Sequence, residues 1–185
     1  MEWLGADKNC KIEASDMAAE YFNYAIDQDI THDINFVKGF KKLLYKNIYP
    51  DIDIEYVFHE KTGIKYNIIV RPGADIRLIK LQYSGAQSLS LDEHNNVIIK
   101  TLLGNMTDHA PVSFQDGKGR EIKTKFILEN NVLSFSVANY DHSKTLVIDP
   151  WVSVTGPELD TAYEVAVDPA GNVWAYGDFN SQVKK

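Results

Sequence analysis

The stretch DIDIEYVFHEKTGIKYNIIV, residues 51–70, decides the fold class, because its apolar residues recur at every second position. Alternate residues of a β-strand point to the same side, so the pattern gives each of two strands one apolar face. These faces consist of Ile52, Ile54, Tyr56 and Phe58 in the first run and Ile64, Tyr66, Ile68 and Val70 in the second. The short loop Glu60-Lys61-Thr62-Gly63 separates the runs, so residues 51–70 are predicted to form a β-hairpin.

Turn signals and further apolar runs follow at close spacing. Pro72-Gly73 suits the centre of a type II turn, and Asn130-Asn131 tolerates the positive φ angles of a two-residue hairpin turn. The runs expected to form strands are 78–83, 97–103, 122–128 and 133–137. Many short strands with regular turn signals predict an all-β fold, with an antiparallel β-sandwich-like domain over residues 45–152.

The first 44 residues support two interpretations of local structure. Ser15 is a good N-cap for a helix that continues through Met17 to Tyr21. The neighbouring YFNYA, residues 21–25, is rich in aromatic residues and equally typical of a strand. Residues 15–26 are therefore left as helix or strand, in an N-terminal segment (1–44) that we expect to pack on the β domain.

Composition excludes several classes of protein. The chain has 185 residues, of which 44% are hydrophobic and 24% charged, which is typical of a globular domain. Its formal net charge of −7 argues against a nucleic-acid partner, and acids surround the short basic cluster Lys38, Lys41, Lys42 and Lys46. Cys10 is the single cysteine, so an internal disulfide and a cysteine-based zinc site are excluded.

Targeting signals are missing from the sequence. No apolar run approaches the 18 residues that would predict a transmembrane helix. The N-terminal residues 1–16 have neither a basic start nor an apolar core, so they do not resemble a signal peptide. We therefore expect either a cytoplasmic protein or a fragment whose export signal lies outside it.

Five stretches occur in the order and at the spacing of a known family. They are YKNIYPDIDIEY (45–56), GIKYNIIVRPGAD (63–75), IKLQYSGA (79–86), HAPVSFQ (109–115) and YDHSKTLVIDP (140–150). Together they resemble the β-rich domain that precedes SBBP-type β-propeller repeats in bacterial cell-surface proteins. Residues 160–181 resemble one such repeat with its Asp-x-x-Gly-Asn turn, so residues 153–185 are expected to form a truncated propeller repeat. Residues 154–157 depart from the family's pattern of serine or threonine, tyrosine and two glycines.

The resemblance implies a cellular location but no enzymatic reaction. It implies export to the cell surface or the extracellular space, and further propeller repeats of the same protein as partners. The function we expect is a non-catalytic structural or interaction module that presents or caps the downstream propeller. The alternative is a protein that binds surface glycan or hydrolyses glycosides.

The acids Asp51, Asp53 and Glu55 are the candidate site for that alternative. Glycoside hydrolysis needs two carboxyl groups on either side of the scissile bond, about 5–9 Å apart. Alternate residues of a strand are about 6.6–6.8 Å apart, but their side chains point the same way. A solvated strand face is therefore the favoured interpretation. Asp53 lies beside the Tyr49-Pro50 turn and is expected to make a local structural hydrogen bond.

Candidate metal and aromatic sites in the sequence also have simpler structural interpretations. No segment matches an EF-hand loop, and a calcium site from Asp168, Asn172 and Asp178 competes with simple turn capping by Asp168. The scattered histidines form no zinc signature and Gly-x-Ser-x-Gly is absent, so no catalytic, cofactor-binding or metal-binding residue is predicted. The aromatic residues of a candidate surface are Trp151, Trp174 and Tyr176. They form either a sugar-stacking platform or, as we favour, propeller core residues that need the next blade.

Overall fold

The computed structural model describes residues 1–24, 34–59, 63–102, 104–116, 119–155, 162–167 and 173–177. These residues are almost entirely β-structure, with one short 3-10 helix, η2 (Ile76–Leu78). Within them, no helix has the length and apolar character needed to cross a bilayer. The strands are β1 (Glu2–Trp3), β2 (Lys11–Tyr24), β3 (Ile34–Tyr49), β4 (Ile52–His59), β5 (Gly63–Val70), β6 (Leu81–Gln82), β7 (Ser88–Leu91), β8 (Val97–Thr101), β9 (Gly104–Gln115), β10 (Arg120–Glu129), β11 (Val132–Val137), β12 (Leu146–Thr155), β13 (Ala162–Val167) and β14 (Val173–Gly177).

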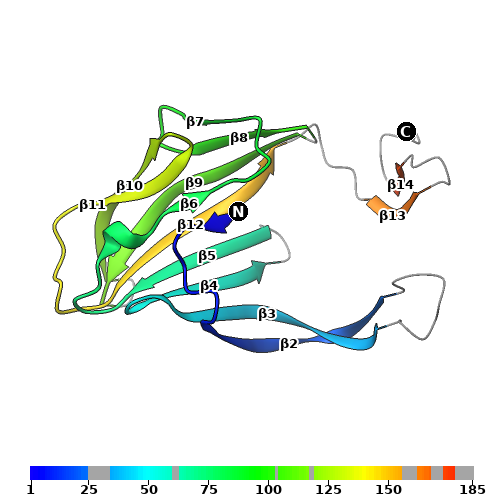
Figure 1. Ribbon diagram of the computed structural model, residues 1–185, viewed down its shortest axis with the longest axis horizontal. Coiled ribbons are helices and arrows are strands. Elements are labelled where there is room, and N and C mark those ends of the chain that lie inside the picture. The colour runs from blue at the N-terminus through cyan, green and yellow to red at the C-terminus, as the bar shows by residue number, and fades with distance from the viewer. Residues whose placement is uncertain are drawn as a thin grey trace.

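Twelve of these strands form one antiparallel sheet that is open at both ends. Its order is β1-β6-β11-β10-β9-β12-β5-β4-β3-β2, with β7 and β8 joined to β9 as a branch. β13 and β14 form a separate two-stranded sheet. Figure 1 shows β5, β12 and β9 in the middle of the large sheet, and β2 and β3 extending beyond it. The expectation of an antiparallel all-β fold is confirmed.

The predicted hairpin of residues 51–70 is formed by β4 and β5. Ile54 pairs with Ile68 across the two strands, and both side chains have 0% exposure. The turn that follows is also the expected one, because the amide of Ala74 donates to the carbonyl of Arg71 (3.1 Å) and Gly73 has a φ of 82°. The outer end of the first apolar run differs from the expectation, since Phe58 is 53% exposed.

Residues 11–24 form the strand β2, which decides between the two interpretations of the N-terminal segment. β2 pairs antiparallel with β3, for example Ile12 with Tyr45 and Phe22 with Val37. A helix from Ser15 would leave that edge of β3 without backbone partners. Pairing with β3 therefore overrides the local capping signal.

Two other local expectations have different outcomes. Asn130 and Asn131 have φ angles of 50° and 61° and connect β10 to β11, so the two-residue hairpin turn is confirmed. The strand expected over residues 78–83 is reduced to β6, because η2 occupies the preceding residues. The carboxylate of Asp75 caps η2 by accepting the backbone N–H of Arg77 (2.9 Å).

The sheet branches at β9, which changes partner along one edge. Its first half pairs with β8 and its second half with β10, and Pro111, which has no backbone N–H, lies between the halves. Two asparagine side chains occupy the junction. The Asn96 carboxamide accepts the N–H of Ala110 (2.9 Å), while the Asn95 carboxamide accepts from the N–H of Phe126 (2.6 Å) and donates to its carbonyl (3.0 Å). The junction thus satisfies backbone groups that no neighbouring strand reaches.

The core lies where the β1–β6 end of the sheet folds over the face of β4 and β5 (Figure 1). The indole of Trp3 donates to the Tyr56 hydroxyl (2.7 Å), and the Tyr49 hydroxyl donates to the carbonyl of Leu4 (2.8 Å). Burial of each large aliphatic side chain here contributes about 1.5–3 kcal/mol. Side chains with 0% exposure come from both layers: Ile54, Tyr66, Ile79, Leu81, Leu133 and Ile148.

Candidate functional site

Asp51, Asp53 and Glu55 do not form a row on a solvated face. Asp51 lies in the turn before β4 with a φ of 58°. Asp53 is only 3% exposed, so the solvated-face interpretation is wrong for this residue. Its Oδ1 accepts the backbone N–H of Asn47 (2.7 Å), which confirms the expected local hydrogen bond. Its Oδ2 pairs with the guanidinium of Arg71.

The Asp53–Arg71 pair fixes the end of the hairpin to the preceding strand. Arg71 also donates through Nη1 to the side-chain oxygen of Asn47 (2.9 Å), and its backbone N–H donates to the carbonyl of Asp51 (3.0 Å). Asn47 has a φ of 50°, so the contacts hold an unusual backbone conformation in β3. Both oxygens of Asp53 are thus engaged in structural contacts.

Glu55 is occupied by a different contact. Its Oε2 accepts from the side-chain amide of Asn67 (2.8 Å), the residue directly opposite in β5. A glycosidase needs two carboxyl groups that face each other across a bound sugar. Asp53 and Glu55 instead lie on one strand, and Asp53 is buried in an ion pair. Their arrangement therefore does not provide that geometry.

Sequence reasoning missed Asp108 in β9, an acid buried in the core. This residue has 0% exposure, and its Oδ2 accepts from the hydroxyls of Tyr66 (2.6 Å) and Tyr83 (2.7 Å). Among the described residues its Oδ1 has no partner. Burial raises the pKa of Asp108 to about 7, although the two tyrosine donors act in the opposite direction. The one sequence signal is that Asp108 follows Met106 at the strand period, which puts an acid in phase with the core side.

The Asp108 cluster holds three parts of the sheet together. Tyr66 belongs to β5 and Tyr83 follows β6, so both layers of the core are tied to β9. Burial also raises the pKa of both phenols, which keeps them protonated as hydrogen-bond donors. Because no atom of the Asp108 side chain is exposed to solvent, the cluster is a structural link rather than a site that a substrate reaches.

Of the aromatic residues of the candidate surface, Trp151 is the one whose side chain the structure describes. Trp151 in β12 is 39% exposed, and its ring stacks on His109 with centroids 3.6 Å apart and planes 5° apart. The His109 Nε2 contacts the Ser153 hydroxyl (2.7 Å), and burial lowers the pKa of the ring. Trp174 and Tyr176 lie on β14, whose side chains are outside the described residues, so a shared platform stays a prediction.

No metal centre emerges from the residues that can be compared. Within the described ranges, no three histidine, cysteine, aspartate or glutamate side chains gather as they would around an ion. The calcium candidates Asp168, Asn172 and Asp178 lie outside those ranges.

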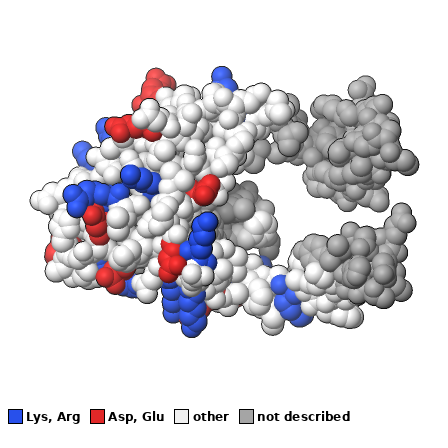
Figure 2. Space-filling view, viewed as in Figure 1, with Lys and Arg blue, Asp and Glu red and all other residues white. Residues whose placement is uncertain are grey.

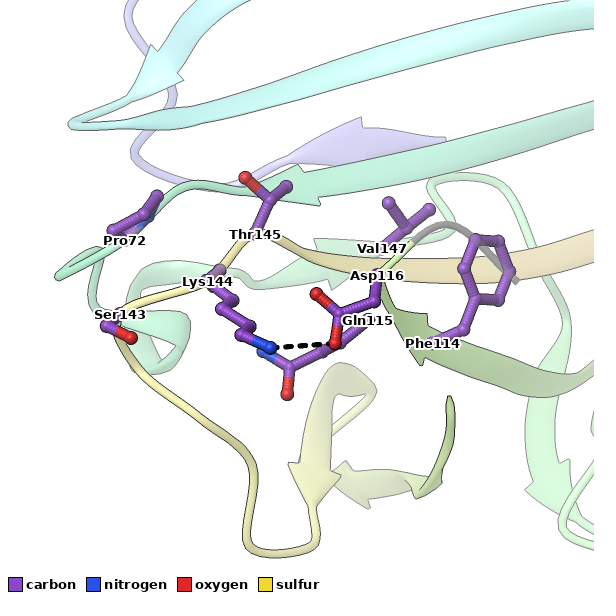
Figure 3. A pocket seen from close by; sticks show the side chains of 8 residues that line it. All are labelled: Pro72, Phe114, Gln115, Asp116, Ser143, Lys144, Thr145 and Val147. Carbon is purple, nitrogen blue, oxygen red and sulfur yellow. Dashed lines mark hydrogen bonds and ion pairs between the residues drawn. The ribbon is translucent and has the colours of Figure 1, made fainter. Parts of the chain in front are cut away.

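A pocket of about 400 Å³ opens between loops at the end of the sheet where β12 begins (Figure 3). The ion pair between Lys144 Nζ and Asp116 Oδ2 (2.8 Å) crosses it. The buried Gln115 amide donates to the carbonyl of Asp141 (2.8 Å), and its Oε1 accepts the N–H of the same residue (3.0 Å). The Ser143 hydroxyl donates to the Asp141 carboxylate (2.7 Å) without an intervening histidine. Among the described residues that line it, the pocket offers polar groups to a small molecule, and its serine hydroxyl is bonded to a carboxylate.

Large exposed apolar side chains concentrate on β2, β3 and the end of β4, a region that we call the arm surface. Figure 1 shows β2 and β3 projecting past the other strands, and in Figure 2 the described part of this projection is mainly uncharged, with lysine in blue. Exposed fractions reach 60% for Met17 and 70% for Phe36. The members of the arm surface are Ile12, Met17, Tyr21, Phe22, Ile34, Phe36, Phe40 and Phe58.

Comparison with known proteins gives one match. A family model described as "Domain of unknown function (DUF7948)" matches residues 1–151, which run from the N-terminus to Trp151 in β12. No curated protein and no solved structure matches the chain.

Proposed function

We propose that this chain, which belongs to the DUF7948 family, is a non-catalytic structural and interaction module of a bacterial cell-surface protein. In this proposal the sandwich-like domain of residues 45–152 presents or caps a β-propeller that begins with residues 153–185. The five ordered stretches that resemble the domain before SBBP-type repeats support this role. So does the antiparallel all-β fold in which they lie.

The observation that carries the proposal is the arm surface. Eight large apolar side chains, including Phe36 at 70% exposure, lie on three neighbouring strands. A concentration of exposed apolar side chains on one part of a folded domain favours a contact with another protein segment. The structural contacts of Asp53 and Glu55 also support a non-catalytic role, because these are the carboxylates that a hydrolase would need.

Surface labelling of intact cells tests the proposed location at the cell surface. Intact cells of the source bacterium are treated with a membrane-impermeant amine-reactive biotin, and the natural full-length protein is then recovered and probed. We expect biotin on this protein in intact cells and none on a cytoplasmic control. Labelling that appears only after lysis would show that the protein is not at the surface and would overturn the proposal.

A glycan-binding role is the second candidate, and the Trp151–His109 stack favours it. An exposed aromatic ring supplies a flat apolar face, and the ion pair between Lys65 and Asp149 (2.6 Å) supplies polar groups next to it, since Lys65 pairs with Trp151 across the strands.

A glycan array and a polysaccharide-hydrolysis screen separate the two candidates. Reproducible binding that is lost in Trp151→Ala but kept in Leu102→Ala, an 85% exposed control, would establish the glycan-binding role. Turnover that is lost in Asp53→Asn would establish a hydrolase and overturn the non-catalytic proposal. No signal in either assay is the result expected for the structural module.

A further inference from the structure

The N-terminal residues around Trp3 cover the core-facing side of β4 only as far as Tyr56, so the end of this side near Phe58 is exposed. Along β4 the exposure of this side rises from 0% at Ile54 to 53% at Phe58, with Tyr56 half-buried between them. The Trp3 indole bonds to the Tyr56 hydroxyl at the limit of the cover. Beyond it lies a pocket of about 310 Å³, lined by Phe40, Lys41, Leu43, Tyr45, Tyr56, Val57 and Phe58. We call this pocket the open core face.

The chain leaves the large sheet at the same end as the open core face. Trp151 of β12 pairs with Lys65 of β5, which in turn pairs with Val57 of β4. β12 and β4 are therefore parallel to each other and two strand spacings apart, about 9.6 Å. Thr155 lies four residues past Trp151, about 13 Å further along the strand.

The connection to the next element is long enough to reach this pocket. Residues 156–161 join β12 to β13, and a six-residue segment spans up to about 20 Å when extended. The β13–β14 hairpin can therefore reach the side chains of Leu43 and Phe58 without unravelling β12. Tethering at this distance gives the hairpin a high effective concentration at the pocket.

The charges of the two regions are complementary. Of the four lysines in residues 34–49, which form β3, Lys41 lines the open core face, whereas Lys46 is already paired with Glu13 (2.7 Å). Residues 156–183 contain five acids and no base in the sequence: Glu158, Asp160, Glu164, Asp168 and Asp178. Opposite charge of this kind favours and orients an encounter between the two segments.

The hairpin also needs a surface on which to pack. β13 and β14 form a two-stranded sheet with pairs such as Val165 with Ala175 and Val167 with Val173. A hairpin of two strands is only marginally stable alone in water, even when its sequence is as apolar as AYEVAV and VWAYG. Packing on an apolar face such as the open core face would supply the support that a lone hairpin needs.

We propose that the β13–β14 hairpin of this chain docks on the open core face, where Leu43, Tyr56 and Phe58 form the apolar floor. The acids of residues 156–183 then approach Lys41, which lines this face. The inference rests on the proposed interaction role of the domain and names its first partner. The domain caps the first hairpin of the segment that follows it.

Zero-length cross-linking of the full chain tests the docking. Equal amounts of ¹⁴N- and ¹⁵N-labelled protein are mixed, treated with a carbodiimide and analysed by mass spectrometry. We expect cross-links from the lysines of residues 34–49 to the acids of residues 156–183, in peptide pairs that are both light or both heavy. Mixed light–heavy pairs would show that a second copy occupies the face and would overturn the proposal. The absence of any cross-link between the two regions would do the same.

Hydrogen exchange of a matched pair of variants gives an independent readout. Phe58 and Val112 are both 53% exposed, and Val112 lies far from the arm on β9, so neither substitution removes buried core. Phe58→Ser is expected to speed amide exchange in β13 and β14 about tenfold, whereas Val112→Ser leaves it unchanged. Equal exchange in wild type and both variants would contradict the docking. The surface-labelling result is independent of this one, so failure of the docking is distinguishable from failure of the proposed function.

Discussion

The buried carboxyl of Asp108 makes the stability of this protein depend on pH in an unusual direction. The pKa of Asp108 rises from 3.8 to about 7 on folding, because burial disfavours the charged form. The folded state therefore holds a proton that the unfolded state releases between pH 4 and 7. Stability from this group is complete below pH 3.8 and is lost as the pH rises towards 7.

The magnitude follows from the shift. About three pKa units at about 1.4 kcal/mol each correspond to about 4 kcal/mol over the whole interval. Between pH 5 and pH 7 the wild-type free energy of unfolding is expected to fall by about 2.3 kcal/mol relative to Asp108→Asn, because the amide does not titrate and Asp108 is already half ionised at pH 7. Contributions from other titrating groups, such as His109, are common to both proteins and cancel in the difference.

The assay is urea unfolding followed by tryptophan fluorescence at pH 5, 6, 7 and 8, for wild type and Asp108→Asn. Tyr83→Phe serves as a second variant, because Tyr83 donates to Asp108 (2.7 Å) and lowers its pKa. Removal of that donor is expected to move the pH-dependent interval upward. A difference between wild type and Asp108→Asn that stays constant from pH 5 to pH 8 would contradict a raised pKa, since it would mean that Asp108 ionises in the folded protein as readily as in the unfolded chain.

Three further predictions concern contacts that hold the sheet together. Arg71→Met removes one partner of the Asp53 carboxylate. Because the Arg71 side chain is 37% exposed and Asp53 keeps the N–H of Asn47, denaturant unfolding is expected to show a loss of about 1–3 kcal/mol, and an unchanged stability would argue against a structural role for the pair. Asn95→Gly keeps the positive φ of the turn but removes both side-chain bonds to Phe126, for an expected loss of about 1–3 kcal/mol; a melting temperature equal to wild type would contradict this role. Asn131→Val places a β-branched residue at a φ of 61° and is expected to lower the melting temperature. Asn131→Gly is expected to preserve the melting temperature, because glycine adopts this φ without strain. Similar melting temperatures for the two variants would count against a strained turn.

Local features of the fold were predictable because they depend on residues close together in sequence. The alternation in residues 51–70 placed Ile54 and Ile68 on a buried face, and they pair across β4 and β5. Gly73 and the Asn130-Asn131 pair adopt the positive φ angles that their turn types require. Each of these outcomes is set by backbone sterics within a few residues.

The candidate site was less accessible to sequence reasoning, because burial depends on neighbours that are distant in the chain. Alternation put Asp53 on the side assigned to solvent, but Arg71 and the backbone of Asn47 enclose it. The hydrogen bonding of Asp108 could not be predicted from the sequence, since its partner Tyr66 is 42 residues away. The spacing of residues around Asp108 or Tyr66 does not indicate a contact between strands that are far apart in sequence.

The pattern of residues was sufficient to predict that this chain is a β-protein, where two of its hairpins turn and which side of β4 and β5 is apolar. Only the tertiary structure decided that residues 11–24 are a strand, that β9 changes partner at Pro111 and that the β1–β6 end covers the core as far as Tyr56 but not Phe58. The physical reason is the range of the interactions involved. Side-chain period and turn geometry act within a few residues, whereas strand order and the extent of the cover are set by backbone pairing and burial between segments far apart in the chain.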